Sequence, residues 1–350
     1  MTLQNRYEIN GSNSSGGMGD ILYCKDNHLQ RNVVIKLLKD NEEERRLIDE
    51  QKSLLNLRSK HVVQLYDIVR IDGKIGLVLE FIEGKDLSSE SFKDDMNGLV
   101  STLWQISCGL RDIHNEGIIH RDIKPNNIRR NRNGVIKVFD FGLSRKSDSA
   151  KTQSVIGTVV FMAPELWKLG EVEFTSAIDV YAFGVTALAL TQVNVPEGLL
   201  KYPPQPVGLG WLQNTLPDLD PDIVSILERC LEYTPKDRPQ IVEVEHAFRR
   251  HLLKDRHKGL LVMDQQVKEL NCHNRRAKIT YTVGNTLHGE IAIEYNGYDF
   301  NVIAFSGAVF VNNTAVTIGQ KLPGASVITL GNGKKRGFVT FDISNPEVVS

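Results

Sequence analysis

The chain has few cysteines and no pattern among them. Its 350 residues include four, Cys24, Cys108, Cys230 and Cys272, and none belongs to a Cys-x-x-Cys pair. This spacing excludes a disulfide framework and a cysteine zinc site, so we expect a reducing compartment.

Long apolar runs and an excess of charge are also missing. The longest apolar stretch, Val180 to Leu190, is far short of the roughly 20 residues that cross a bilayer. No apolar segment follows the charge near the N-terminus, so no signal peptide is expected. The 42 basic and 43 acidic residues nearly cancel, which leaves no overall basic field for nucleic acid or an anionic membrane. We therefore expect a cytoplasmic protein that binds neither nucleic acid nor membranes.

What remains is an ordinary globular composition with a change of pattern along the chain. Hydrophobic residues make up 41% and charged residues 24%. Residues 7–82 show short strand-like runs around one charged helical stretch, and residues 85–250 are mostly helical in period. Residues 251–275 have no clear period and are interpreted as a connector. Residues 276–350 alternate short strands with Gly and Asn turns, which predicts a small all-β domain.

One polar loop, His120-Arg-Asp-Ile-Lys-Pro-Asn-Asn127, contains the residue types that phosphoryl transfer requires. Asp122 can accept a proton from an attacking hydroxyl, Lys124 can neutralise a moving phosphate, and Asn127 can hold a metal. Asp140 follows an apolar strand in Val-Phe-Asp-Phe-Gly, where a carboxylate would bring Mg²⁺ to phosphates. The alternatives are a polar surface turn for the loop and a turn cap for Asp140.

With these two motifs the chain resembles eukaryotic-type (Hanks-type) serine/threonine protein kinases, in their bacterial form. The resemblance covers about residues 7–250 and implies an α+β, bilobal protein kinase fold followed by the all-β domain. The kinase domain would span 1–250, with a β-rich N-lobe over about 7–82 and a helical C-lobe over about 85–250. The resemblance implies ATP and Mg²⁺ as cofactors, and as catalytic residues Asp122, Lys124, Lys36 and Glu50.

The resemblance also implies a nucleotide site. Its residues would be Ser14, Gly16, Gly17, Gly19, Ile21, Val34, Lys36, Leu79, Glu80, Ile82, Asn127 and Asp140, with Asn127 and Asp140 on the metal. Ser14 departs from the family because it replaces the first glycine of the phosphate-covering loop. Arg129 stands where many kinases place a leucine under the adenine. We expect its aliphatic stem to form the floor of the pocket, with its guanidinium in water.

Other residues match structural and regulatory positions of the family. Glu165 is implied to pair with Arg238 in a buried ion pair, and Asp179 to anchor the catalytic loop, a role compatible with an ordinary N-cap. Arg121 would pair with a phosphorylated activation loop. We predict autophosphorylation at Thr152 or Ser154, with Thr158 as a structural and substrate-positioning hydroxyl. An unregulated polar loop is the alternative.

The expected function is that of an ATP-dependent, non-specific serine/threonine protein kinase acting on protein hydroxyls. Its regulation would come from activation-loop autophosphorylation, with a homodimer as a candidate arrangement in trans, and from the β-domain. We hypothesise that this domain is a sensor or docking module with a ligand or protein partner of its own. Two other classes stay open: a nucleotide-binding pseudokinase that acts as a scaffold, and a kinase for a small molecule.

Overall fold

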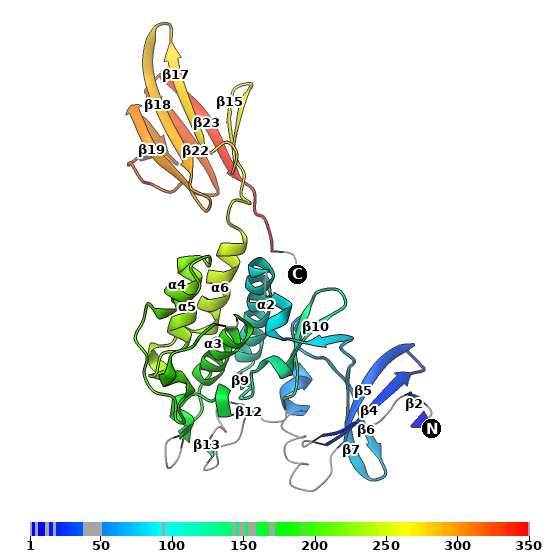
Figure 1. Ribbon diagram of the computed structural model, residues 1–350. Coiled ribbons are helices and arrows are strands. Elements are labelled where there is room, and N and C mark those ends of the chain that lie inside the picture. Colours follow the sequence, from blue (N-terminus) through cyan, green and yellow to red (C-terminus); the bar gives the residue numbers. More distant parts are fainter. Residues whose placement is uncertain are drawn as a thin grey trace. The chain divides into compact units, whose positions relative to one another are not determined.

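The computed structural model describes residues 2–3, 6–10, 14–16, 19–37, 51–92, 95–141, 145–146, 151–152, 159–167, 172–191 and 193–348. The chain forms two compact units, Met1–Phe248 and Arg249–Val349 (Figure 1). The first contains a β-rich lobe and a helical lobe, and the second is all β, as the sequence predicts. No helix in the described part of the chain is both long and apolar enough to cross a membrane.

The β-rich lobe is a seven-stranded sheet in the order β1-β2-β4-β5-β7-β6, with β3 paired to β4. Its strands are β1 (Thr2–Leu3), β2 (Tyr7–Ile9), β3 (Ser14–Gly16), β4 (Gly19–Asp26), β5 (Arg31–Leu37), β6 (Leu65–Ile71) and β7 (Lys74–Glu80). Alternate residues of a strand point to opposite faces. On one face Leu22, Val33, Ile35 and Val78 belong to a buried apolar cluster. The other face is therefore left for the site.

The helical lobe packs around α2 (Met96–Asn115) and α3 (Ala177–Thr191). The spacing of Leu99, Leu103 and Leu110 predicts α2, and these side chains are buried along it. Asp95 caps the helix by accepting a hydrogen bond of 2.7 Å from the backbone N–H of Gly98. The other helices are α4 (Trp211–Thr215), α5 (Pro221–Cys230) and α6 (Ile241–Leu252), with short 3₁₀ turns at Ser89–Phe92, Pro125–Asn127, Val159–Phe161, Pro164–Trp167, Glu197–Leu200 and Pro235–Asp237.

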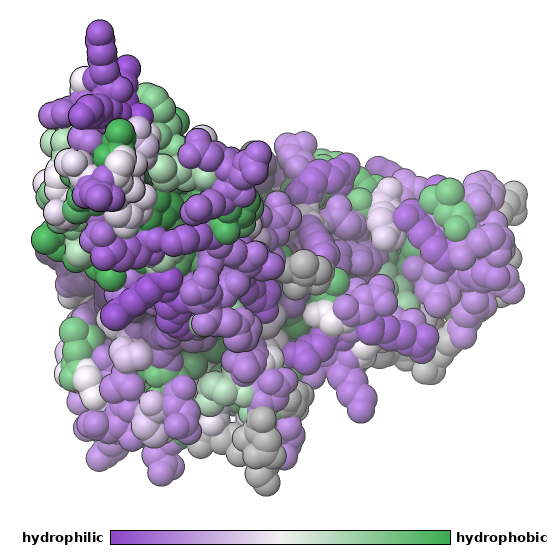
Figure 2. Space-filling model, turned by 90° about the horizontal axis from the view of Figure 1, so that it is seen from above, coloured by the Kyte–Doolittle hydropathy of each residue, from purple (hydrophilic) through white to green (hydrophobic). Residues whose placement is uncertain are grey.

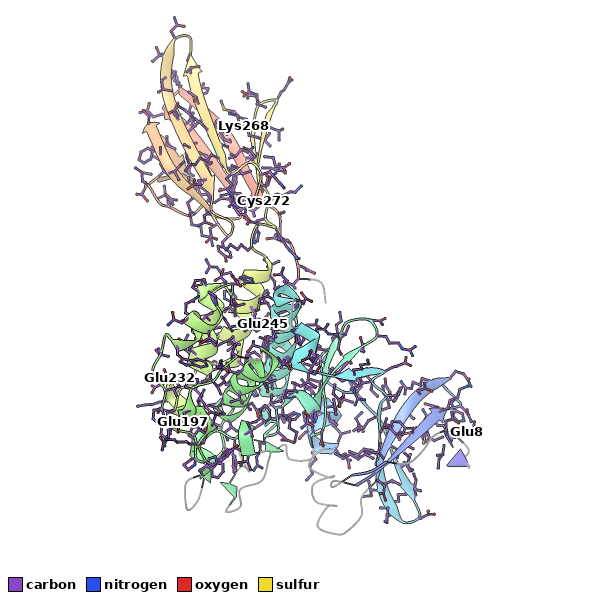
Figure 3. The ribbon with its side chains drawn as sticks, viewed as in Figure 1. Glu8, Glu197, Glu232, Glu245, Lys268 and Cys272 are labelled. Atoms are coloured by element: carbon purple, nitrogen blue, oxygen red, sulfur yellow. The ribbon has the colours of Figure 1, made fainter. Side chains whose placement is uncertain are left out.

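Short strands and one polar contact complete this lobe. The strands are β8 (Gly84–Asp86), β9 (Ile118–Ile119), β10 (Ile128–Asn131), β11 (Ile136–Val138), β12 (Arg145–Lys146), β13 (Lys151–Thr152) and β14 (Val172–Glu173). The indole N–H of Trp104 in α2 donates to the buried carboxylate of Glu245 in α6 at 3.1 Å (Figure 3). This bond joins two helices that are distant in the sequence.

The second unit contains a six-stranded and a three-stranded sheet. The first sheet has the order β16-β15-β23-β22-β20-β21 and the second β17-β18-β19. The strands are β15 (Gly259–Met263), β16 (Gln266–Leu270), β17 (Arg276–Val283), β18 (Thr286–Tyr295), β19 (Phe300–Gly307), β20 (Val309–Val311), β21 (Thr314–Ala315), β22 (Ala325–Asn332) and β23 (Lys335–Ile343). Residues from both sheets share one apolar core, in which Phe300 stacks on Tyr295 at 4.6 Å and meets Phe341 edge-on at 5.4 Å.

The connector that the sequence predicts over 251–275 is wrong, because β15 and β16 lie within it. The two strands form a hairpin, and β15 also pairs with β23 near the end of the chain. Leu261 is fully buried, whereas most of β16 is exposed and only Leu270 reaches the core. An edge strand with so few buried positions gives too short an apolar alternation to be recognised, and a pairing partner some 80 residues away leaves no local signal.

Hydrophilic residues cover most of the face of the molecule shown in Figure 2, and hydrophobic residues show through in separate patches. Exposed large side chains of the second unit include Val267, Ile318 and Phe338. Scattered exposed apolar residues of this kind are normal for globular proteins.

Candidate active site

Four side chains implied in nucleotide binding lie on one face of the N-terminal sheet. Ile21 is directly opposite Lys36 across β4 and β5, and Val34 is directly opposite Leu79 across β5 and β7. Cross-strand partners share a face, and so do alternate residues of one strand. These four residues, from three strands, therefore project on the same side. The opposite side is the lobe's apolar core.

Lys36 meets Asp140 across the two lobes. Its Nζ lies 2.9 Å from Asp140 Oδ1, although the residues are 104 positions apart in the sequence. Asp140 has φ +66°, a left-handed conformation that costs a non-glycine residue on the order of 1–3 kcal/mol. Strained backbone of this kind collects at functional sites, where the surrounding structure maintains it. Here it sets a carboxylate, about a quarter of it exposed, beside a buried lysine.

Asp122, Lys124 and Asn127 form a compact group in the loop that joins β9 to β10. Lys124 Nζ lies 2.8 and 3.0 Å from the two carboxylate oxygens of Asp122. The amide of Asn127 donates to the backbone carbonyl and to Oδ2 of Asp122, both at 2.8 Å. The amide nitrogen of Asn127 is thus used within this group, and its amide oxygen is the atom that could hold a metal. Asp122 and Asn127 are each 5% exposed, so their geometry is fixed by their surroundings.

A fully buried carboxylate, Asp179 near the start of α3, fixes this loop. It accepts hydrogen bonds of 2.8 Å from the backbone N–H groups of His120 and Arg121 and contacts Nε2 of His114 at 2.9 Å. Burial acts to raise the pKa of Asp179, but the bond from His114, the nearby histidines and the N–H of Arg121 together hold that pKa below its ordinary value. The carboxylate thus stays charged and orders the backbone next to Asp122, where Arg121 itself has φ +71°.

Glu165 and Arg238 form a bidentate, buried ion pair. The two contacts measure 2.7 and 2.8 Å, and the guanidinium also donates to the backbone carbonyls of Glu232, Tyr233 and Ala177. A buried charge pair is stable only when its remaining donors and acceptors are satisfied, as they are here. The pair joins the 3₁₀ turn Pro164–Trp167 to the segment after α5.

Arg129, in β10, contacts the segment between the two lobes. Its guanidinium is partly exposed and has partners that the sequence did not predict: Nε and Nη2 lie 2.7 and 2.6 Å from Oδ1 of Asp86, and Nη1 reaches the carbonyl of Ile82 at 3.4 Å. The reason is strand pairing, because Arg129 in β10 is directly opposite Asp86 in β8. Sequence reasoning missed this acid, since nothing local shows that residues 84–86 form a strand.

Sequence reasoning also missed His114 and Lys137. His114 lies in the last turn of α2 and reaches Asp179. Lys137, in β11, is buried and contacts Glu80 of the hinge at 2.8 Å. A basic residue within an apolar strand is the one signal that could have identified Lys137, because a buried lysine needs a partner.

Several implied residues cannot be placed. Gly17, Glu50, Ser154 and Thr158 lie outside the described part of the chain.

Other implied residues lie in short strands. Ser14, Gly16 and Gly19 belong to the β3–β4 hairpin, where Ser14 is opposite Ile21 and Gly16 is opposite Gly19. Thr152 lies in β13, which pairs with β14. Just after β14, the ring of Phe174 packs 3.9 Å from the guanidinium carbon of Arg121.

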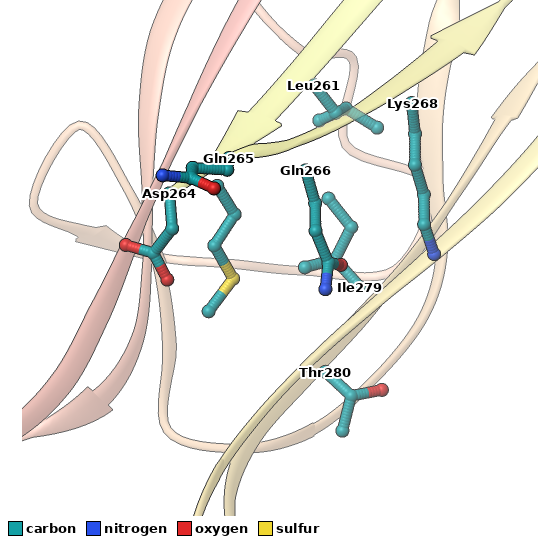
Figure 4. Close-up of a pocket in the computed structure, with 8 residues that line it drawn as sticks. Leu261, Asp264, Gln265, Gln266, Lys268, Ile279 and Thr280 are labelled. Atoms are coloured by element: carbon teal, nitrogen blue, oxygen red, sulfur yellow. The ribbon is translucent and has the colours of Figure 1, made fainter.

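The second unit has a cavity of about 410 Å³ between the two sheets' edge strands β16 and β17. The side chains around it, shown in Figure 4, come from Leu261, Met263, Asp264, Gln265, Gln266, Lys268, Ile279 and Thr280. Apolar residues lie beside a carboxylate, two amides, a hydroxyl and an ammonium group. Lys268 donates to the backbone carbonyl of Lys278 at 2.5 Å and so connects the two edges.

Comparisons with known proteins agree on the first unit. The family model described as "Protein kinase domain" matches residues 7–248. A probable serine/threonine-protein kinase of Clostridium acetobutylicum is 30% identical over 257 residues, covering 68% of this chain and 38% of that protein. Serine/threonine-protein kinase PrkC of Bacillus subtilis is 32% identical and covers 55% and 31% of the two chains. Serine/threonine-protein kinase PknA of Mycobacterium tuberculosis is 30% identical and covers 68% and 59%. The chain thus spans between about a third and three fifths of the length of these relatives.

Proposed function

The chain belongs to the protein kinase domain family, and from this membership we propose that it transfers the γ-phosphate of ATP to serine and threonine hydroxyls of proteins. The acceptor type is inferred from Lys124, two residues after Asp122, and from the similarity to bacterial serine/threonine-protein kinases. The chain spans only part of the length of each relative, so the proposal names the acceptor groups and no particular substrate protein.

The proposal depends on two clusters of side chains whose chemistry fits phosphoryl transfer. One group is Asp122 with Lys124 and Asn127, and the other is Lys36 with Asp140. In the proposed reaction Asp122 orients the acceptor hydroxyl and takes its proton as the oxygen attacks the γ-phosphorus, while the bond from that phosphorus to the bridging oxygen breaks and ADP leaves. Lys124 then offsets the negative charge of the phosphoryl group in transit. Lys36 holds the other phosphates.

The donor set fits Mg²⁺. Asp140 supplies carboxylate oxygens and Asn127 an amide oxygen, which are hard ligands of the type that Mg²⁺ accepts together with phosphate and water. When bound, the ion would neutralise charge on the phosphates. The contact between Lys36 and Asp140 would then give way to separate contacts of each with the nucleotide and its metal.

Intact mass of the purified full chain after incubation with Mg²⁺ and ATP tests this proposal. We expect gains of one phosphate mass each, absent in Asp122→Asn and Lys36→Met. An Asp342→Asn variant, which changes an exposed carboxylate of the second unit, should behave as the wild type. ATP binding without any mass gain, on the chain or on an added protein substrate, would instead favour the pseudokinase scaffold.

Regulation by phosphorylation of the activation segment is part of the proposal. The cation Arg121 directly precedes Asp122, so a phosphate brought to it would order the activation segment, residues 140–165. Peptide mapping of active protein should find phosphate at Thr152 or Ser154, and alanine at both positions should lower activity. An active chain that carries no phosphate between residues 144 and 158 would contradict this regulation.

We also propose that the second unit is a sensor or docking module. Its cavity, with mixed polar and apolar lining, supports a ligand site, and its edge strands support a protein contact. A chain ending after residue 256 should differ from the full chain in kinase rate, substrate choice or oligomeric state. All three tryptophans lie in the first unit, so their emission verifies that this unit stays folded. No change in any of the three properties would refute the module.

A further inference from the structure

The cavity of the second unit has an apolar floor and, at its rim, one charged group of each sign. Leu261 and Ile279 form part of the floor and are buried in the apolar core of the unit. Asp264 and Lys268 are exposed, and they lie toward opposite sides of the cavity with Gln266 between them (Figure 4). The volume of about 410 Å³ lies within the range of sites that bind small molecules. The lining therefore suits a ligand with an apolar body and a charge at each end.

Neither of these two charges is neutralised within the part of the chain that the structure describes. The carboxylate of Asp264, in the turn between β15 and β16, has no ion-pair or hydrogen-bond partner among those residues. The ammonium of Lys268 donates to the carbonyl of Lys278 at 2.5 Å, a neutral acceptor that uses one of its three donors. By contrast, the side chain of Lys278 on the neighbouring strand pairs with Glu290 at 2.8 Å. A ligand with two opposite charges would give Asp264 and Lys268 the partners they lack.

The cavity also lies where each sheet has an outermost strand. β16 is the last strand of the six-stranded sheet and β17 of the three-stranded sheet, and no described strand pairs with the outer edge of either. A backbone bond of 2.9 Å from Asn271 to Asn274 closes the turn that joins them. The outer edge of a strand presents backbone N–H and C=O groups, which bind the backbone of an extended peptide. Peptide groups in a ligand would therefore find partners beside the apolar floor.

We propose that this cavity binds a short peptide with free ends. Its ammonium group contacts Asp264, its carboxylate contacts Lys268, and one apolar side chain packs on the floor. Asp264 and Lys268 are four residues apart, so the chain between them spans at most about 14 Å, which accommodates an extended tripeptide of about 10 Å. The inference rests on the proposed sensor role of the second unit and names the class of its ligand.

Calorimetry of the full chain with the tripeptide Ala-Leu-Ala tests the ligand class. We expect saturable binding to the wild type. Acetylation of the peptide's N-terminus or amidation of its C-terminus should each weaken binding by about twofold to fivefold, the range of one partly exposed charge pair. Ala-Asp-Ala should bind more weakly, because it places a carboxylate on the apolar floor. Leucine alone should also bind more weakly, because it has no peptide group for the strand edges.

Variants of the two charged residues assign the ends of the peptide. Asp264→Asn should weaken Ala-Leu-Ala as acetylation does, and acetylation should then have no further effect. Lys268→Gln should do the same for amidation. Asp264 has φ +52°, a conformation that asparagine tolerates well, so the first variant keeps the turn. The matched controls, Asp342→Asn and Lys334→Gln, change exposed residues that do not line the cavity and should match the wild type.

Three results would overturn the inference: no binding of Ala-Leu-Ala, equal affinity for its free and capped forms, or leucine binding as tightly as the tripeptide. These measurements require no phosphoryl transfer and no truncation. A chain that binds no tripeptide but changes its kinase properties when the second unit is removed would keep the module and refute this ligand. A chain that binds the tripeptide through Asp264 and Lys268 but is unchanged by the truncation would refute the module and support the ligand.

Discussion

The two units of the chain differ in where they place charge. Among the described residues, every buried charged side chain lies in the first unit, whereas the core of the second is formed by apolar residues and the buried polar side chains there, Ser326 and Thr329, are uncharged. The second unit keeps its ion pairs at the surface. Arg276 with Glu294 and Lys278 with Glu290 are examples, with the basic side chains 72% and 62% exposed.

This difference indicates what each unit can do. A buried charge is costly unless it is paired and hydrogen-bonded, and in the first unit one such group, Asp179, holds the loop that carries Asp122. Such sites hold charged groups at fixed positions, as phosphoryl transfer requires. The second unit offers no such internal group in its described residues, so its contribution to function is expected at its surface and its cavity.

The largest effect should come from removing the charge at the centre of the first unit. Asp122→Asn keeps the shape of the side chain but cannot accept a proton, so the phosphorylation rate should fall by about 10²- to 10⁴-fold. Steady-state kinetics with a protein substrate measures it. Glu294→Gln, a carboxylate lost from the second unit, should leave the rate unchanged. A rate in Asp122→Asn within threefold of the wild type would contradict the role of Asp122.

The next largest effect should be a loss of stability when the buried ion pair of Glu165 and Arg238 is broken. Glu165→Gln leaves Arg238 buried without its charge partner and should lower the free energy of unfolding of the first unit by about 3–5 kcal/mol. Denaturant titration followed by tryptophan emission reports on this unit, because all three tryptophans belong to it. A loss below 1 kcal/mol would show that the buried pair does not stabilise the lobe.

Protonation of Asp179 at acid pH should lower the stability of the first unit. Its folded-state pKa is lowered, so the carboxylate contributes stability that is fully present above the unfolded value of about 3.9 and is lost as the pH falls below it. The stability difference between wild type and Asp179→Asn should therefore be constant from pH 7 to 5 and shrink toward pH 2. Denaturation midpoints from tryptophan emission measure it. A stability difference that grew on acidification would contradict the lowered pKa of Asp179.

The smallest effect should come from the surface of the second unit. Arg276→Met removes an exposed pair and should change stability by about 0.5 kcal/mol or less, since such pairs are screened by solvent. Far-UV circular dichroism, which senses the strands, follows it. A loss of stability as large as that of Glu165→Gln would show that ion pairs stabilise the two units equally.

Much of the architecture could be predicted from the sequence because its signals are local. The four- and three-residue spacing of Leu99, Leu103 and Ile106 indicates α2, and the Gly and Asn turns after residue 276 indicate hairpins. The hairpin β15–β16 could not be predicted, since two buried residues in β15 and one in β16 are too weak a pattern.

For the site, the sequence by itself determined which chemical groups are available and in what order. Asp122, Lys124, Asn127 and Asp140 stand in short motifs whose composition indicates phosphoryl transfer before any contact is known. Only the tertiary structure decided which distant groups meet: Lys36 with Asp140, His114 with Asp179, and Arg129 with Asp86. The reason is physical. A motif is defined by neighbours along the chain, whereas an ion pair forms where packing and strand register bring two side chains within about 4 Å, and no local pattern encodes that meeting.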